Sequence, residues 1–192
     1  GLFIHRQANS PTSSGYAEIP GNDFIVSLGA FTDGVGSPDQ QAGTLMHELG
    51  HNLGLLHGGP SPKAGENISI DQRNDNCKPN YISVMSYARQ FSSYLPNRAL
   101  DYSNKALASL DENHLNENLG IGSYSTPEQN VIIGSPVRTV QTGQPIDWND
   151  NKVSNNDVKV NINNIGISGC SDDDGTPAYK ILDGADDWSN LV

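Results

Sequence analysis

Residues 37–54 read SPDQQAGTLMHELGHNLG, and this stretch carries the strongest helical pattern of the chain. Ser37 with Gln40 three residues later has the form of a capping box, and Pro38 suits the first helical position. Gly54 provides a stop after the last apolar residue. The pattern predicts a helix from about Pro38 to Leu53, because apolar side chains recur at spacings of three and four: Ala42, Leu45, Met46, Leu49 and Leu53.

The composition of the whole chain excludes several function classes. Its 192 residues include 11 Lys and Arg against 22 Asp and Glu, which gives a formal net charge of −11. Such an acidic chain argues against a surface for phosphate backbones, so we expect no nucleic-acid partner. No apolar run approaches the roughly 20 residues of a membrane-spanning helix. The length suits one domain, or two small ones, with a buried core.

The segments on either side of the helix predict an α+β fold class. Three short strands are expected before it, in Gly1 to His5, Ser14 to Ile19 and Asp23 to Leu28, the last being rich in β-branched and aromatic residues. Gly58 to Pro79 is dense in turn-forming residues and is expected to be a loop. A second helix is expected from Asp111 to about Asn118, with leucines on one side and Gly120 after its end: Leu110, Leu115 and Leu119.

The predicted helix contains His47-Glu48-Leu49-Gly50-His51, followed by Gly54 and His57, in the pattern H-E-x-x-H-x-x-G-x-x-H. Residues four apart lie one above the other on a helix, so His47 and His51 can face one metal ion. Gly54 tolerates a positive φ, which lets the chain turn back and bring His57 in as a third ligand. Three neutral imidazoles and one water are the ligand set of a catalytic zinc.

Glu48 has the placement of a general base. It follows His47 directly and is offset from the ligand face, so its carboxylate can hold a zinc-bound water without ligating the metal. A chance match over five fixed positions arises on the order of once in ten thousand sequences. We therefore interpret the histidines as zinc ligands rather than as side chains that cap or pack a helix.

With Ser83-Val84-Met85-Ser86-Tyr87 downstream, the zinc pattern resembles the metzincin clan of zinc endopeptidases. Met85 corresponds to the methionine of the clan's Met-turn, beneath the zinc ligands, although an isolated methionine can also be core filler. Tyr87 matches a tyrosine of astacins and serralysins that ligates zinc and swings to the transition state. The resemblance implies a catalytic domain in residues 1–122, with a mixed twisted sheet, an active-site helix and a C-terminal helix.

The resemblance also implies how a polypeptide is bound. In the clan an edge strand antiparallel to the substrate precedes the zinc helix, and Ser14 to Ile19 fits that order. Arg89 and Phe91 lie where the clan builds its main specificity pocket. Gly58, after the third histidine, departs from the usual subfamilies, so the subfamily is unassigned. The clan's first strand, first long helix and second strand have no counterpart here, and a removed pro-segment or N-terminal fragment is expected to carry them.

Two cysteines, Cys77 and Cys170, allow one internal pairing. A bridge would tie the C-terminal region to the floor of the active site and would indicate an oxidising compartment, whereas two free thiols are the alternative. With the bridge we expect a secreted, extracellular protein. Asn67-Ile68-Ser69 is a glycosylation sequon, meaningful only in a source that glycosylates secreted proteins. Asp101 is a candidate acceptor for a ligand imidazole, with a turn aspartate as the alternative.

The acidic C-terminal region, residues 123–192, contains a candidate calcium loop. Oxygen side chains stand at the first, third and fifth positions of an EF-hand-type spacing, with a backbone carbonyl at the seventh and an aspartate next to the twelfth: Asp147, Asn149, Asn151, Val153 and Asp157. Lys152 replaces the expected glycine, so a solvated loop rich in Asp and Asn is the alternative. Asp183, Asp186 and Asp187 are a second candidate.

These features predict a secreted zinc endopeptidase that hydrolyses internal peptide bonds of a protein or peptide substrate with one catalytic Zn²⁺. Ca²⁺ is a second cofactor if the tail loop binds it. The rival is a catalytically silent zinc-containing binding module with a calcium-binding acidic tail. The intact Glu48 argues against that rival, because a structural zinc needs no general base.

Overall fold

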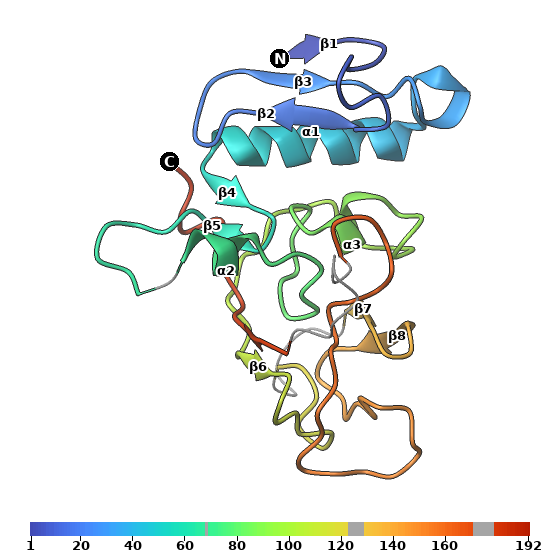
Figure 1. Ribbon diagram of the computed structural model, residues 1–192, viewed down its shortest axis with the longest axis vertical. Helices are drawn as coiled ribbons and strands as arrows, with labels where there is room; N and C mark the ends of the chain where they lie inside the picture. The colour runs from blue at the N-terminus through green and yellow to red at the C-terminus, as the bar shows by residue number, and fades with distance from the viewer. Residues whose placement is uncertain (68, 123–128, 171–178) are drawn as a thin grey trace.

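A three-stranded sheet lies over the longest helix at one end of the computed structural model (Figure 1), which describes residues 1–67, 69–122, 129–170 and 179–192. The strands are β1 (Leu2–Phe3), β2 (Gly15–Ala17) and β3 (Phe24–Val26), in the order β1-β3-β2. β1 runs parallel to β3 and β2 antiparallel to it. The three expected strands are therefore confirmed in shorter form, the sheet is mixed, and β2 is one of its edges.

Helix α1 (Pro38–Asn52) has the capping box that the sequence predicts. The Ser37 hydroxyl accepts the Gln40 backbone N–H at 3.2 Å, and the Gln40 side chain accepts the Ser37 N–H at 2.9 Å. The helix packs against β2 and β3. Its apolar spacing does not mark its buried side, because Leu45 and Leu49 are 39% and 41% exposed whereas His47 and His51 are buried.

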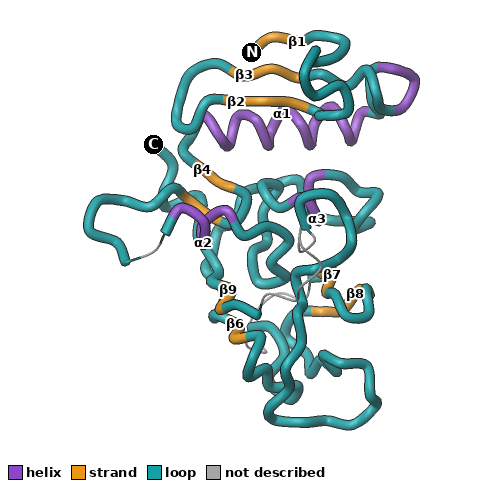
Figure 2. Tube along the Cα trace, in the orientation of Figure 1, coloured by secondary structure: helices purple, strands orange, loops and turns teal. Residues whose placement is uncertain are grey.

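Loops make up most of the chain beyond α1, as Figure 2 shows. The fold is a small α+β structure with low helical content. Its remaining elements are η1 (Thr32–Gly34), β4 (Leu55–Leu56), β5 (Gly59–Pro60), α2 (Ile70–Asn74), α3 (Tyr87–Gln90), β6 (Leu110–Asp111), β7 (Asn130–Ile133), β8 (Arg138–Gln141) and β9 (Ile181–Leu182). β4 pairs with β5, β6 with β9 and β7 with β8, all antiparallel.

Helix α2 lies within the segment that was expected to be loop only. Ser69 and Gln72 form a second capping box around its first turn. This pair is the sequence signal for α2, although the segment around it is rich in turn-forming residues.

The prediction of a helix over Asp111 to Asn118 is wrong. Asp111 belongs to β6, and its carboxylate accepts the Asn113 backbone N–H at 2.9 Å, which closes a turn in place of a helical turn. Leu115 exchanges two backbone hydrogen bonds of 2.9 Å with Val158, so its main chain is committed to a partner distant in sequence. In the described part of the chain no helix follows α3, and the expected C-terminal helix is not found there.

Buried apolar side chains form separate clusters, of which one lies among the irregular segments and another lies against α1. The largest joins strands β6, β7 and β9 to the loops around them, with members that include Leu110, Ile121, Val131, Trp148 and Leu182. A second lies beside α1 and comprises Leu55, Tyr81, Val84, Met85, Tyr102 and Ala185. The domain boundary after residue 122 stays a prediction, and the largest cluster draws residues from both sides of it.

Two buried glutamates stabilise the irregular segments around the largest cluster. Glu112 accepts the backbone N–H groups of Ile162 at 2.6 Å and of Lys180 at 2.9 Å. Glu117 accepts those of Trp148 and Asn155 at 2.9 and 2.7 Å. Since buried N–H groups need partners, these carboxylates do for the loops what strand pairing does in a regular sheet.

Cys77 and Cys170 form a disulfide with a Cα–Cα distance of 5.7 Å, which confirms the expected pairing and indicates an oxidising environment. None of the helices in the described ranges has the length and apolar character needed to cross a membrane.

Candidate metal site

Three histidines meet beside the C-terminal half of α1. His47 and His51 come from the helix, and His57 comes from the two-residue connection between β4 and β5. One ring nitrogen from each lies within 4.8 Å of the others. Gly54 has φ +85°, as the predicted turn after the helix requires. A search of the described residues for three or more His, Cys, Asp or Glu side chains able to hold a metal ion finds this group of histidines.

The hairpin that carries His57 explains the two glycines after it. Gly58 is buried, and a Cβ there would approach the Asp75 and Arg73 carbonyl oxygens to less than 3.0 Å. Gly59 has φ +142°, which a residue with a side chain rarely adopts. Glycine at these two positions therefore has a packing cause and a backbone cause in this chain.

Backbone carbonyls orient the helical histidines. Nδ1 of His47 lies 3.1 Å from the Val84 oxygen, and Nδ1 of His51 lies 2.8 Å from the Leu55 oxygen. A carbonyl only accepts, so Nδ1 donates in both rings and Nε2 keeps its lone pair for a metal. Asp101 does not take this role: its carboxylate accepts the Tyr102 N–H and the Trp188 indole N–H.

Burial also sets the charge of the site. It lowers the pKa of all three imidazoles, to about 4 for His57 and well below the usual range for His47. The rings are therefore neutral near pH 7, which is the form that binds metal ions. Burial raises the pKa of Glu48 to about 8, because desolvation disfavours the charged form of its carboxylate.

Glu48 points toward the edge of the sheet. It is buried on α1, and a Cβ on Gly15 of β2 would lie within 3.0 Å of its carboxylate. Gly15 therefore allows the carboxylate to reach the backbone of the edge strand. The sequence pattern of the zinc helix carries no signal for this glycine.

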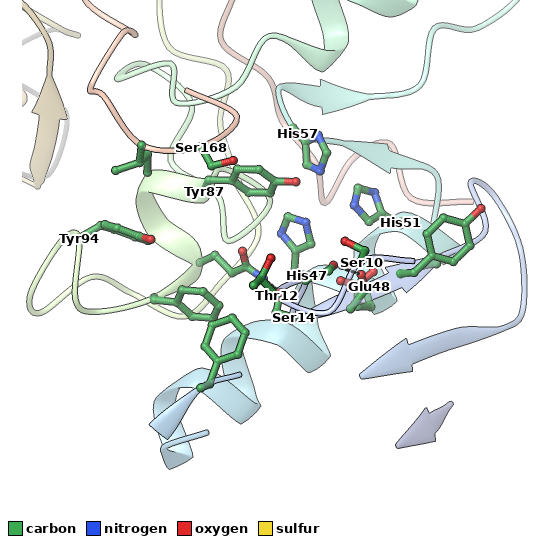
Figure 3. A pocket seen from close by; sticks show the side chains of 18 of the residues that line it. Ser10, Thr12, Ser14, His47, Glu48, His51, His57, Tyr87, Tyr94 and Ser168 are labelled. Atoms are coloured by element: carbon green, nitrogen blue, oxygen red, sulfur yellow. Dashed lines mark hydrogen bonds between the residues drawn. The ribbon is translucent and has the colours of Figure 1, made fainter. Parts of the chain in front are cut away.

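The histidines and Glu48 form the floor of a cleft of about 660 Å³. β2 and the preceding segment from Ser10 to Ser14 line one side, and Tyr94 lies on the other (Figure 3). Phe91 also lines the cleft. The expected specificity residue Phe91 thus faces the cleft. Arg89 does not: it is buried and donates to the Asn130 carbonyl and the Gln129 side chain.

Met85 and Tyr87 both lie close to the histidines. Met85 is fully buried, and a Cβ on Gly50 would overlap its sulfur, so the methionine packs directly beneath α1 between the two helical ligands. The ring of Tyr87 lies 4.7 Å from that of His57 and 5.6 Å from that of His47, measured between centroids. Tyr87 also lines the cleft.

The candidate calcium residues are only partly gathered. Asp147 accepts the backbone N–H groups of Asn151 and Lys152, and Asn149 accepts that of Asn151, so these side chains share one loop. Asn151 accepts the N–H of Val153, whereas Asp157 pairs with His114. Calcium binding there stays a prediction.

The second calcium candidate separates into different contacts. Asp187 is buried and accepts the Tyr81 hydroxyl, while Asp186 accepts from Ser189. Within the described ranges no metal-binding group includes Asp183, Asp186 and Asp187. The sequon at Asn67 includes Ile68, which lies outside the described residues.

Comparisons of this chain with protein-family models, with curated proteins and with solved structures found no match. The class of the site therefore rests on its residues and geometry. These define a candidate metal site, a group of three histidines able to hold an ion such as zinc, at the floor of an open cleft.

Proposed function

We propose that the protein is a secreted zinc endopeptidase of the metzincin type, which hydrolyses internal peptide bonds of polypeptides. One observation carries the proposal: three neutral imidazoles converge beside a buried glutamate on the floor of a cleft that runs along an edge strand. A zinc ion held by His47, His51 and His57 supplies Lewis-acid polarisation of the scissile carbonyl and lowers the pKa of a water.

The residues of the chain account for the remaining steps. β2 is an edge strand whose outer backbone groups can pair with an extended substrate, which gives main-chain recognition with little sequence preference. Glu48 takes the proton from the attacking water and delivers it to the leaving amine. The Tyr87 hydroxyl donates a hydrogen bond to the oxyanion that develops at the scissile carbonyl.

The test combines metal content with digestion of casein. Glu48→Gln should bind zinc in the same amount as wild type, because the three imidazoles remain, and should lose nearly all proteolysis. Glu66→Gln, at an exposed glutamate that does not line the cleft, is the matched control and should keep both zinc and activity. Equal loss of zinc and activity in Glu48→Gln would show that Glu48 supports the fold and does no chemistry.

The same assay addresses the rival function, a catalytically silent zinc module. That module would bind zinc and leave casein intact in the wild type, and Glu48→Gln would then change neither readout. The position of Glu48 favours the enzyme, because its buried carboxylate lines the cleft beside the histidines, where hydrolysis needs a general base and a structural zinc needs none.

A further inference from the structure

A loop from the C-terminal region, Ile165–Cys170, packs against the ring of Tyr87. Gly169 faces the ring, and a Cβ on this glycine would lie 2.6 Å from Cε2 and 2.8 Å from Cδ2 of Tyr87. The ring of His57 lies on Tyr87 as well, at 4.7 Å between centroids. Figure 3 shows Ser168 of this loop next to Tyr87, and both residues line the cleft.

The loop is held in place by its own contacts. The Ile165 N–H donates to the Cys170 oxygen at 3.0 Å, and the Cys170 N–H donates to the Ile167 oxygen at 2.9 Å. Ile165 and Cys170 are buried in a small cluster with Cys77 and Ala88. These contacts therefore hold Gly169 in place against the ring of Tyr87.

A second connection reaches the backbone of the same tyrosine. The Asn76 side-chain oxygen accepts the Tyr87 N–H at 2.9 Å. The Asn163 side chain donates to the Asn76 carbonyl at 3.2 Å, and the next residue, Cys77, forms the disulfide to Cys170. The C-terminal region thus holds Tyr87 at both its ring and its main chain.

We propose that Gly169 is a positioning residue for Tyr87: its lack of a side chain sets how far the ring lies from His57 and where the phenol enters the cleft. The effect on turnover rests on the proposed peptidase function, whereas the effect on the ring does not. A side chain at residue 169 would push the ring toward the histidines or move the loop away from it.

Gly166 provides a matched control within the same loop. It has φ +69°, close to the φ +79° of Gly169, but a Cβ there would meet no atom within 4 Å. Gly166→Ala therefore introduces the same backbone strain without the collision. Any difference between the two alanine variants reports the contact with Tyr87.

The first measurement is made on the metal-free protein. Ring signals of labelled tyrosine are recorded by NMR, and the Tyr87 signal is assigned from its loss in Tyr87→Phe. Gly169→Ala should shift the Tyr87 signal, and Gly166→Ala should leave it in place. An unmoved Tyr87 signal in a folded Gly169→Ala protein overturns the proposal. If Gly169→Ala does not fold, adding Tyr87→Ala, which removes the ring that the new Cβ would meet, should restore folding, and a double variant that stays unfolded overturns the proposal.

The second measurement is steady-state cleavage of a casein peptide by the zinc-loaded protein. Gly169→Ala should lower kcat by about 10-fold to 10²-fold with KM nearly unchanged, toward the loss expected for one transition-state donor. In a Tyr87→Phe background the same substitution should lower kcat no further. Equal losses in Gly169→Ala and Gly166→Ala would overturn the proposal in favour of backbone strain. An inactive wild type would reject the proposed function alone, and the NMR shift would still decide the role of Gly169.

Discussion

Single residues decide how closely the chain approaches the histidines. Gly15 lets Glu48 reach the edge strand, Gly50 makes room for the sulfur of Met85, and Gly58 brings the His57 hairpin against neighbouring carbonyls. At each of these positions a Cβ would come within 3.0 Å of another atom. Backbone and side chains around the histidines are therefore in direct contact at these glycines, and a larger residue at any of them would require its neighbours to move.

Tyr87→Phe tests the residue whose hydroxyl we place in the cleft. The phenyl ring keeps its contacts with His57 and Gly169, so zinc content and the melting temperature should stay near wild type. A donor realised only in the transition state affects kcat more than KM, and we expect a loss of about 10²-fold in kcat from peptide-cleavage kinetics. A Phe variant with lower stability and normal turnover would instead make Tyr87 a structural support of the turn.

Asp187→Asn tests a buried carboxylate away from the metal site. Asp187 accepts the Tyr81 hydroxyl and the Ser103 N–H, and burial raises its pKa to about 6 from the usual 3.8. The folded state thus binds its proton more tightly than the unfolded state, so this contribution to stability is full below pH 3.8 and is lost as the pH rises through 6.

Relative to Asp187→Asn, the wild type should therefore lose about 2 kcal/mol of unfolding free energy between pH 4 and pH 7. Urea unfolding of both proteins across this range measures the difference. Asp71→Asn, at an exposed aspartate, is the control for a general effect of charge. A difference that is constant with pH would show that Asp187 ionises as readily in the folded chain as in the unfolded one.

At the scale of elements, α1 determines the site more than any other segment. It supplies two ligands and Glu48, and the sheet packs against it through β2 and β3. Its start is defined by Ser37 and Gln40, whose reciprocal hydrogen bonds satisfy two backbone donors. The cap therefore fixes where the helix that carries His47 and His51 begins.

Ser37→Ala should lower the free energy of unfolding by about 1 kcal/mol, the usual cost of an N-cap hydroxyl. Ser69→Ala removes the same capping box from the short and exposed helix α2, and it should cost less, because local fraying of α2 leaves the core intact. Urea midpoints with unchanged m-values provide the comparison. A larger loss in Ser69→Ala than in Ser37→Ala would contradict the leading role of α1.

At the scale of the whole molecule, the C-terminal region is joined to the site from several directions. The Lys78 ammonium donates to the Gly58 and Asp183 carbonyls at 2.6 Å each, which links the residue after His57 to the last part of the chain. The backbone N–H of Val192 donates to Leu53 at the end of α1. The disulfide joins cysteines that are 93 positions apart in the sequence, and it adds a covalent bond to these hydrogen bonds.

Replacing both cysteines, as Cys77→Ser with Cys170→Ser, should lower the free energy of unfolding by about 4 to 5 kcal/mol through the added entropy of the unfolded chain. Reversible urea unfolding, with the wild type measured in the absence and presence of reductant, gives the value. Unreduced wild type should show no thiol reactive to alkylation. A loss below about 1 kcal/mol would mean that the non-covalent contacts alone hold the C-terminal region in place.

The sequence by itself determined what depends on neighbours along the chain. The capping box, the helix and the spacing of His47 and His51 follow from contacts three and four residues apart, so α1 and its ligand pair are predictable. Tertiary structure alone decided which side of α1 is buried, why Asp111 to Asn118 is not a helix, and that Phe91 faces the cleft while Arg89 does not. It also placed Gly169 on Tyr87. Each of these outcomes depends on a partner far away in the sequence, and a periodic pattern carries no information about such a partner.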